Sequence, residues 1–129
     1  MIVTVTRVLI VDDDPVIRVV VGALFMQEGY AIDTAEDGRQ ALEQVRVAQP
    51  DAIVLDLLMP VMDGASFLDA CHEQGLCTQT PVIVFSAKRK AAESALKSLR
   101  TRGVRAVLAK PFDLVALTAV VGQYAPVAV

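Results

Sequence analysis

The chain has 129 residues, of which 54 % are hydrophobic and 21 % are charged. This length predicts one domain of ordinary size, and the apolar content is sufficient for its own core and excludes intrinsic disorder. The formal net charge of -3 argues against a protein that coats nucleic acid. The two cysteines, Cys71 and Cys77, lack a second Cys or His pair at ligand spacing, which excludes structural zinc and predicts reduced thiols in a reducing compartment.

The two ends of the chain give no signal for membrane targeting. Residues 1–7 are too short and too polar for a signal peptide. The long uncharged stretch 114–129 contains Gly122 and Pro126 and is shorter than the roughly 20 apolar residues that span a bilayer. We therefore expect a soluble, cytoplasmic protein without membrane insertion.

Short apolar runs rich in β-branched residues predict strands that are buried on both faces of a parallel sheet. In chain order, these strands are 8–11, a weaker one at 31–35, 53–55, 82–85 and 107–109. Apolar residues recur at helical spacing between the strands, and the last helix is expected over 114–122. Five strands alternating with five helices predict an α/β fold with a parallel sheet.

Capping and breaking residues agree with this alternation. The expected N-caps are Asp14, which precedes Pro15, then Asp37, and Asp113 for the last helix, while the expected helix ends are Gly29, Gly75 and Gly103. Asp63 and Gly64 predict a turn into the third helix.

The first helix is apolar over almost its whole length. We expect one set of its side chains to face the sheet and another to face outward. The first set is Ile17, Val20, Val21 and Leu24, and the second is Val16, Val19, Ala23 and Met26. Exposed apolar residues usually mark a partner surface, although neighbouring segments that cover the helix are an alternative.

Polar residues follow the predicted strands at the edge where open parallel sheets place their functional sites. They are Asp12, Asp13 and Asp14 after the first strand, Asp56 after the third, Ser86 at the end of the fourth and Lys110 after the fifth. Crowded carboxylates need a compensating positive charge. Lys110 supplies one charge, and the oxygen ligands favour Mg²⁺, with Mn²⁺ as an alternative. Such a site suits a phosphoryl group, for which a carboxylate can be the nucleophile.

Four motifs in this order resemble those of the receiver domains of two-component response regulators. They are Ile10 to Pro15, Leu55 to Pro60 followed by Met62-Asp63-Gly64, Phe85-Ser86-Ala87, and Lys110-Pro111-Phe112. The resemblance covers about residues 7–123 and implies a flavodoxin-like, doubly wound sheet of strand order 2-1-3-4-5. We accordingly expect residues 1–129 to form a single receiver domain without an output domain in this chain.

The resemblance also implies a role for each site residue. Asp56 is expected to be the phosphoacceptor, assisted by Lys110, the Ser86 hydroxyl and the Ala87 backbone amide. The expected Mg²⁺ ligands are Asp13, Asp56 and the Leu58 backbone carbonyl, with Asp12 acting through water. The Lys110-Pro111 peptide bond is expected to be cis.

Partners follow from the same resemblance. A histidine kinase or histidine phosphotransfer protein is expected to dock on the first helix. A downstream protein or a second copy is expected on the face formed by the fourth helix, fifth strand and fifth helix, where the outer side of the last helix carries Val115, Ala116 and Ala119. The protein is expected to promote only its own phosphorylation and dephosphorylation, and no direct contact with nucleic acid is expected.

Three positions in this chain bear on how such a domain works. Val107 stands where the family often has an aromatic switch residue, so the readout must use loop and helix shifts or differ altogether. Leu58 and Lys88 occupy positions that tune phosphoryl lifetime in the family. His72, the only histidine, is expected on the surface.

Two alternative functions remain open. Val107 and the apolar helices are compatible with an interaction scaffold that works without phosphorylation. A phosphohydrolase with an aspartyl nucleophile would share the sheet and the metal, but it normally needs an acid/base Asp where Leu58 stands.

A basic segment, 88–105, is interpreted first as a solvated helix face and second as a docking site for an acidic partner.

Overall fold

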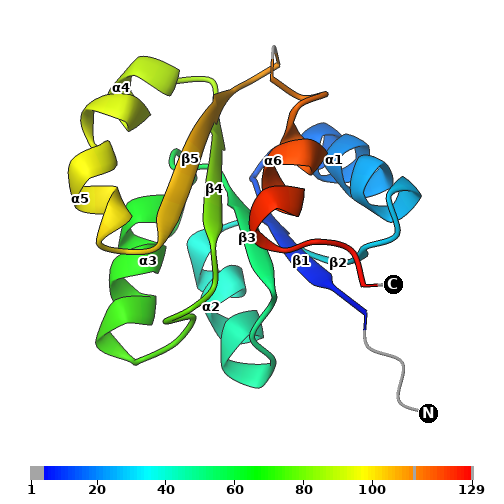
Figure 1. The fold of residues 1–129 in the computed structure, drawn as a ribbon. Coiled ribbons are helices and arrows are strands. Elements are labelled where there is room, and N and C mark those ends of the chain that lie inside the picture. The colour runs from blue at the N-terminus through cyan, green and yellow to red at the C-terminus, as the bar shows by residue number, and fades with distance from the viewer. Residues whose placement is uncertain (1–4, 112, 129) are drawn as a thin grey trace.

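A parallel sheet forms the centre of the computed structural model, which describes residues 5–111 and 113–128 (Figure 1). Its strands in the described residues are β1 (Arg7–Val11), β2 (Ala31–Ala35), β3 (Ala52–Leu55), β4 (Val82–Ser86) and β5 (Val104–Ala109). They lie in the order β2-β1-β3-β4-β5, and each pair is parallel. The structure thus confirms the predicted flavodoxin-like sheet.

Helices cover both faces of the sheet (Figure 1). The described residues contain α1 (Pro15–Gln27), α2 (Gly38–Val47), α3 (Gly64–Glu73), α4 (Arg89–Ser94), α5 (Leu96–Arg100) and α6 (Leu117–Tyr124). Side chains of α1 and α6 pack together on one face, and those of α2 to α5 pack on the other. Within β1, Val8 and Ile10 contribute to the first of these cores and Leu9 and Val11 to the second, as the period of two in a strand requires.

The predicted N-caps Asp14 and Asp37 are confirmed for α1 and α2, and Asp63, predicted as part of a turn, is the N-cap of α3. Each of the three carboxylates accepts a hydrogen bond from a backbone N–H of the first turn. The three glycines expected to end helices, Gly29, Gly75 and Gly103, all have positive φ angles, a conformation that glycine adopts without steric cost.

The predicted number of helices is wrong, because the expected fourth helix is interrupted at Ala95 and becomes α4 and α5. Ser94 provides a physical reason, since its hydroxyl donates to the Lys90 carbonyl at 2.9 Å. A serine that bonds back to the preceding turn competes with the helical pattern and often bends a helix. The described residues therefore contain six helices rather than five.

The predicted start of the last helix is also wrong. α6 begins at Leu117, and Ala116 at its N-cap makes no side-chain capping bond. The Asp113 carboxylate instead accepts a hydrogen bond from the Ala109 backbone N–H at 2.8 Å, at the end of β5. The Asp113 carboxylate, which was predicted to cap the last helix, therefore binds the end of β5 instead.

The buried face of α1 is rotated relative to the prediction. Val21, Gly22 and Phe25 are its buried residues, whereas Val20 is 38 % exposed. The outward positions expected for Val16, Val19, Ala23 and Met26 are confirmed, because all four are exposed. A helix that is apolar all round gives no sequence signal for the phase of its buried stripe.

The C-terminal tail returns to the beginning of the chain. The Thr6 hydroxyl donates to the Pro126 carbonyl at 2.8 Å, and the buried Tyr30 hydroxyl donates to the Ala125 carbonyl at 2.9 Å. Both ends of the described chain consequently lie together (Figure 1), and the tail leaves Val115 86 % exposed. Among residues 5–111 and 113–128, no helix has the length and apolar character needed to cross a membrane.

Candidate functional site

Three carboxylates meet at the carboxyl ends of β1 and β3. Asp12 and Asp13 follow β1, and Asp56 follows β3, its neighbour in the sheet. The Asp56 backbone N–H donates to the Val11 carbonyl at 2.9 Å, which fixes the two strand ends side by side. One carboxylate oxygen from each of these three residues lies within 4.8 Å of the others. Asp12 and Asp56 are buried, while Asp13 faces solvent.

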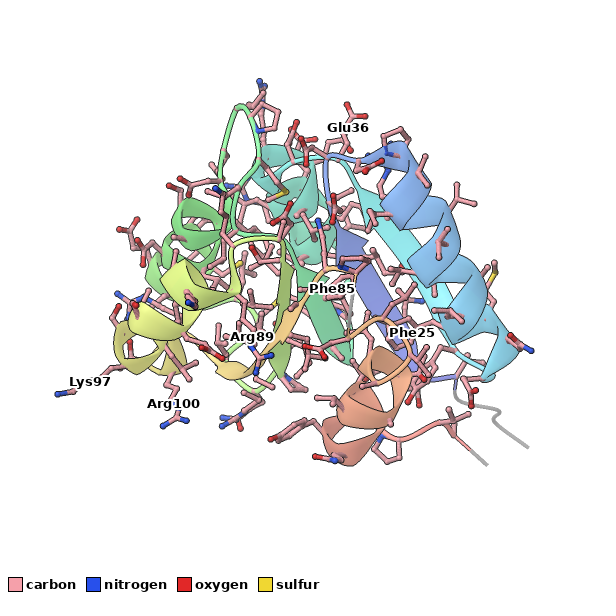
Figure 2. All side chains as sticks on the ribbon, turned by 90° about the horizontal axis from the view of Figure 1, so that it is seen from above. Phe25, Glu36, Phe85, Arg89, Lys97 and Arg100 are labelled. Carbon is pink, nitrogen blue, oxygen red and sulfur yellow. The ribbon has the colours of Figure 1, made fainter. Side chains whose placement is uncertain are left out.

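Lys110 brings a positive charge to this cluster from the end of β5. Its ammonium is ion-paired with Asp12 and lies 3.2 Å from Asp56 Oδ2. The same nitrogen stands 5.9 Å from the centre of the Phe85 ring, which is labelled in Figure 2, a view onto this end of the sheet. The Lys110 backbone N–H donates to the Ser86 carbonyl at 3.0 Å, and the Lys110-Pro111 bond is cis as the resemblance implied.

Burial and charge shape the protonation of the pair. Burial, the largest influence, raises the pKa of Asp56; the Lys110 ammonium opposes this increase, and the charge of Asp12 adds to it. For Lys110, burial alone would lower the pKa, but hydrogen bonds and attraction from Asp12 and Asp56 together outweigh it and raise the pKa. The lysine is therefore charged at neutral pH, and Asp56 is the carboxylate that burial disfavours in its ionised form.

Asp12 is held in place by the first turn of α1. Its Oδ1 accepts a hydrogen bond from the Asp14 backbone N–H at 2.9 Å, while the Arg18 guanidinium donates to its backbone carbonyl at 2.8 Å. On the other side, the Asp12 N–H donates to the Ala35 carbonyl of β2 at 3.1 Å. The position of Asp12 is thus fixed by two neighbouring segments, the start of α1 and the end of β2.

The loop after Asp56 is packed closely against the start of α3. The Leu58 backbone N–H donates to Asp56 Oδ1 at 3.3 Å, and the Gly64 N–H donates to the Leu57 carbonyl at 3.0 Å. A Cβ atom at Gly64 would lie 2.6 Å from the Asp56 carbonyl oxygen. Sequence reasoning interpreted Gly64 as part of a turn and of a family motif, and it missed this close approach, for which a single sequence carries no signal.

Ser86 and Lys88 border the site on the side of β4. Ser86 is buried, and its hydroxyl oxygen accepts a hydrogen bond from the Lys88 backbone N–H at 3.0 Å. Ala87, directly after β4, is exposed. A hollow of about 260 Å³ adjoins Ser86 and is lined by Leu57, Leu58, Ser86, Lys88, Ala91 and Ala92.

The structure therefore brings together four of the charged residues that the sequence singled out, Asp12, Asp13, Asp56 and Lys110, while Asp14 caps α1. Their oxygen-only donor set fits a hard divalent cation such as Mg²⁺, which needs few protein ligands and keeps several waters. Val107 is buried opposite Val84 in the sheet, and His72 is exposed on α3 as predicted. Phe112, part of the last motif, lies outside the described residues.

Curated proteins with related sequences are longer than this chain. The chain is 35 % identical over 118 residues to the response regulator MprA of Mycolicibacterium vanbaalenii, which covers 88 % of this chain and 47 % of that protein. It is 40 % identical over 106 residues to a protein-glutamate methylesterase/protein-glutamine glutaminase of Anaeromyxobacter dehalogenans, which covers 81 % of this chain and 29 % of the relative. The chain thus spans less than half the length of these relatives.

Solved structures with this fold match nearly end to end. The chemotaxis response regulator CheY4 of Vibrio cholerae has a TM-score of 0.82 at 32 % identity, and the match covers 94 % of this chain and 99 % of that one. The response regulator TrrA of Thermotoga maritima, in complex with Mg²⁺ and BeF, has a TM-score of 0.79 at 28 % identity, with coverage of 92 % and 98 %.

The family model for the response regulator receiver domain matches residues 8–122. This range contains β2 to β5, all of β1 except Arg7, and the residues of the acidic cluster. Together, the strand order, the carboxylates paired with a lysine at the sheet edge and the matched range establish that the chain belongs to the response regulator receiver domain family of two-component systems.

Proposed function

We propose that Asp56 accepts a phosphoryl group from a phosphohistidine on a histidine kinase or histidine phosphotransfer protein. The observation that carries this proposal is the position of the Asp56 carboxylate, 3.2 Å from the Lys110 ammonium and within 4.8 Å of the carboxylates of Asp12 and Asp13. The Mg²⁺ and BeF bound to TrrA support the same use of the corresponding fold.

Mg²⁺ would be held by the Asp13 and Asp56 carboxylates and the Leu58 backbone carbonyl, with Asp12 acting through water. Bound there, the ion would neutralise negative charge on the phosphoryl oxygens. Asp13 is exposed, so this ligand is accessible to an ion from solvent. The Lys110 ammonium would contact another phosphoryl oxygen and keeps Asp12 as its partner when Asp56 is modified.

In the transfer, a carboxylate oxygen of Asp56 forms a bond to phosphorus as the bond between phosphorus and the imidazole nitrogen breaks. The histidine leaves with the electron pair of that bond and takes up a proton, and Asp56 becomes an acyl phosphate. Ser86 and the Ala87 amide would donate to the remaining oxygens. The Ser86 oxygen already accepts from the Lys88 N–H, so its own hydrogen is available to a phosphoryl oxygen.

The phosphodonor would dock on α1, where apolar side chains face solvent beside the acidic site. Val16 is 65 % exposed and Val19 is 71 % exposed, and Asp14 at the start of this helix directly follows Asp13. A large exposed apolar surface of this kind marks a partner site.

The phosphorylated state would be read by a downstream protein or a second copy on the face of α4, α5, β5 and α6. Lys97 and Arg100 point away from the body of the molecule on this side (Figure 2), and Val115 is exposed beside α6. Because Val107 is buried and cannot swing as an aromatic ring does, the change would reach this face through the loop after Ser86 and the start of α4. The domain would modify no substrate other than itself.

The test is phosphorylation of the purified chain by acetyl phosphate with Mg²⁺, followed by intact-mass measurement. The parent should gain the mass of one phosphoryl group, and Asp56→Asn should gain none. Asp33→Asn, which removes an exposed carboxylate from β2, is the matched control and should be modified like the parent. An unmodified parent would support the scaffold instead, and turnover of an added phosphoester would support the phosphohydrolase.

A further inference from the structure

A pair of thiols lies at the end of the sheet opposite the acidic site. Cys71 and Cys77 border a cavity of about 270 Å³ whose other walls include Ile53, Val82 and Gly103. These three residues stand at the amino-terminal ends of β3, β4 and β5, whereas Asp56, Ser86 and Lys110 stand at the carboxyl-terminal ends. The proposed phosphorylation chemistry uses neither cysteine.

We propose that Cys71 and Cys77 form a redox site that peroxides convert reversibly into an intramolecular disulfide. Both thiols are free in this structure. They border the same cavity, and Cys77 packs against the hydrophobic cluster that contains Cys71. The fold therefore already places the two side chains on the wall of one cavity.

The backbone explains why two residues six positions apart border the same cavity. Cys71 lies in the last turn of α3, and the Leu76 N–H donates back to the Cys71 carbonyl at 2.8 Å. The next residue, Cys77, has a φ angle of 54°, which is uncommon for a residue other than glycine. Its N–H donates to the Gln49 side-chain oxygen at 2.6 Å, which holds this turn in place.

The two thiols differ in exposure and acidity, and this difference assigns them separate roles. Cys71 is 4 % exposed, whereas Cys77 is partly exposed. The neighbouring Cys71 thiol lowers the pKa of Cys77 to about 7, and the Cys77 thiol, together with burial, raises the pKa of Cys71. Thiolate is the reactive form of cysteine, so Cys77 is the thiol that attacks and Cys71 is the thiol that resolves.

The reaction is balanced with hydrogen peroxide as the oxidant. The Cys77 thiolate attacks one peroxide oxygen, the O–O bond breaks, and Cys77 becomes a sulfenic acid while the other oxygen leaves as hydroxide and takes a proton to become water. The Cys71 sulfur then attacks the Cys77 sulfur, an S–S bond forms, and the sulfenic oxygen leaves as a second water. Two electrons pass from the two thiols to the peroxide, and a dithiol reductant reverses the change.

The test is mass spectrometry of the full chain after treatment with hydrogen peroxide and alkylation of remaining thiols in the unfolded state. Glu73 lies between the two cysteines, so cleavage after glutamate, without reduction, separates them unless they are joined. The expected product is a pair of linked peptides whose combined mass is lower by two hydrogen atoms, with loss of both alkylation sites. A dithiol should restore both sites.

Single substitutions assign the roles of the two sulfurs. Cys71→Ser should leave Cys77 as a sulfenic acid that dimedone traps, and Cys77→Ser should leave Cys71 largely unreacted and alkylated only after unfolding. The proposal is overturned if the peroxide-treated parent yields separate peptides with both thiols alkylated, a disulfide between two copies, or only sulfinic acid. The result on the unsubstituted chain decides the matter even where a variant folds poorly.

Discussion

Replacing Lys110 by Met tests whether the positive charge of this lysine stabilises the folded protein by compensating the buried carboxylates of Asp12 and Asp56. The ammonium is the partner of Asp12 and Asp56, which are 3 % and 6 % exposed. Removing one member of a buried ion pair costs about 3 to 5 kcal/mol. Each carboxylate keeps one backbone hydrogen bond, from Asp14 and Leu58 respectively, so we expect the lower end, about 3 kcal/mol, without Mg²⁺.

Urea unfolding followed by circular dichroism measures this loss, with Lys97→Met as the matched control at an exposed position. The control should stay within about 0.5 kcal/mol of the parent. Because Mg²⁺ supplies the missing charge, saturating Mg²⁺ should stabilise the Lys110→Met variant more than the parent. The reasoning is refuted if both lysine variants unfold at the same urea concentration, or if Mg²⁺ stabilises the parent and the Lys110 variant equally.

Two further predictions concern Asp56 and its surroundings. Gly64→Ala should weaken Mg²⁺ binding and slow phosphorylation by acetyl phosphate, because the new Cβ would lie 2.6 Å from the Asp56 carbonyl oxygen. The control is Gly75→Ala, where a Cβ meets no atom within 4 Å. It should alter stability but change neither the Mg²⁺ affinity nor the phosphorylation rate. Asp56→Asn should raise the free energy of unfolding without Mg²⁺ at neutral pH, because it removes a buried carboxylate whose charge repels that of Asp12. The sign follows from the raised pKa of Asp56 in the folded protein. The parent loses stability as the pH rises from the pKa of this carboxyl in the unfolded chain to its pKa in the folded protein. The stabilisation by Asn is therefore complete above the folded-state pKa and absent below the unfolded-state pKa. Urea titrations of parent and variant across acidic to neutral pH measure it, and a gain that is constant with pH would contradict the electrostatic cause.

The sheet and the acidic cluster were predictable because their signals are local. Runs of β-branched residues mark strands that are buried on both faces, and residues at the carboxyl ends of parallel strands share one edge. Asp12, Asp56 and Lys110 could therefore be placed together from strand positions alone, and the structure confirms that they meet.

The features that sequence reasoning missed depend on competition between partners. Sequence alone allows Asp113 to cap the last helix or to bind the strand end, and only the folded chain shows that the Ala109 N–H binds it. Ser94 can donate to its own helix or to solvent, and its bond to Lys90 accompanies the break at Ala95. Cys77 likewise reaches the cavity that Cys71 borders with a positive φ angle that residue type does not predict.

The hydrogen bond between Thr6 and Pro126 holds together the two ends of the described chain, which are distant in sequence but adjacent in space. Chains with adjacent ends tolerate circular permutation, in which a short linker joins the old ends and a new opening is made in an exposed loop. The exposed residues Thr78 and Gln79, between α3 and β4, offer such an opening. A permuted chain would keep every strand of the sheet intact while presenting its ends beside α3, so a reporter protein could be attached on a different side of the domain.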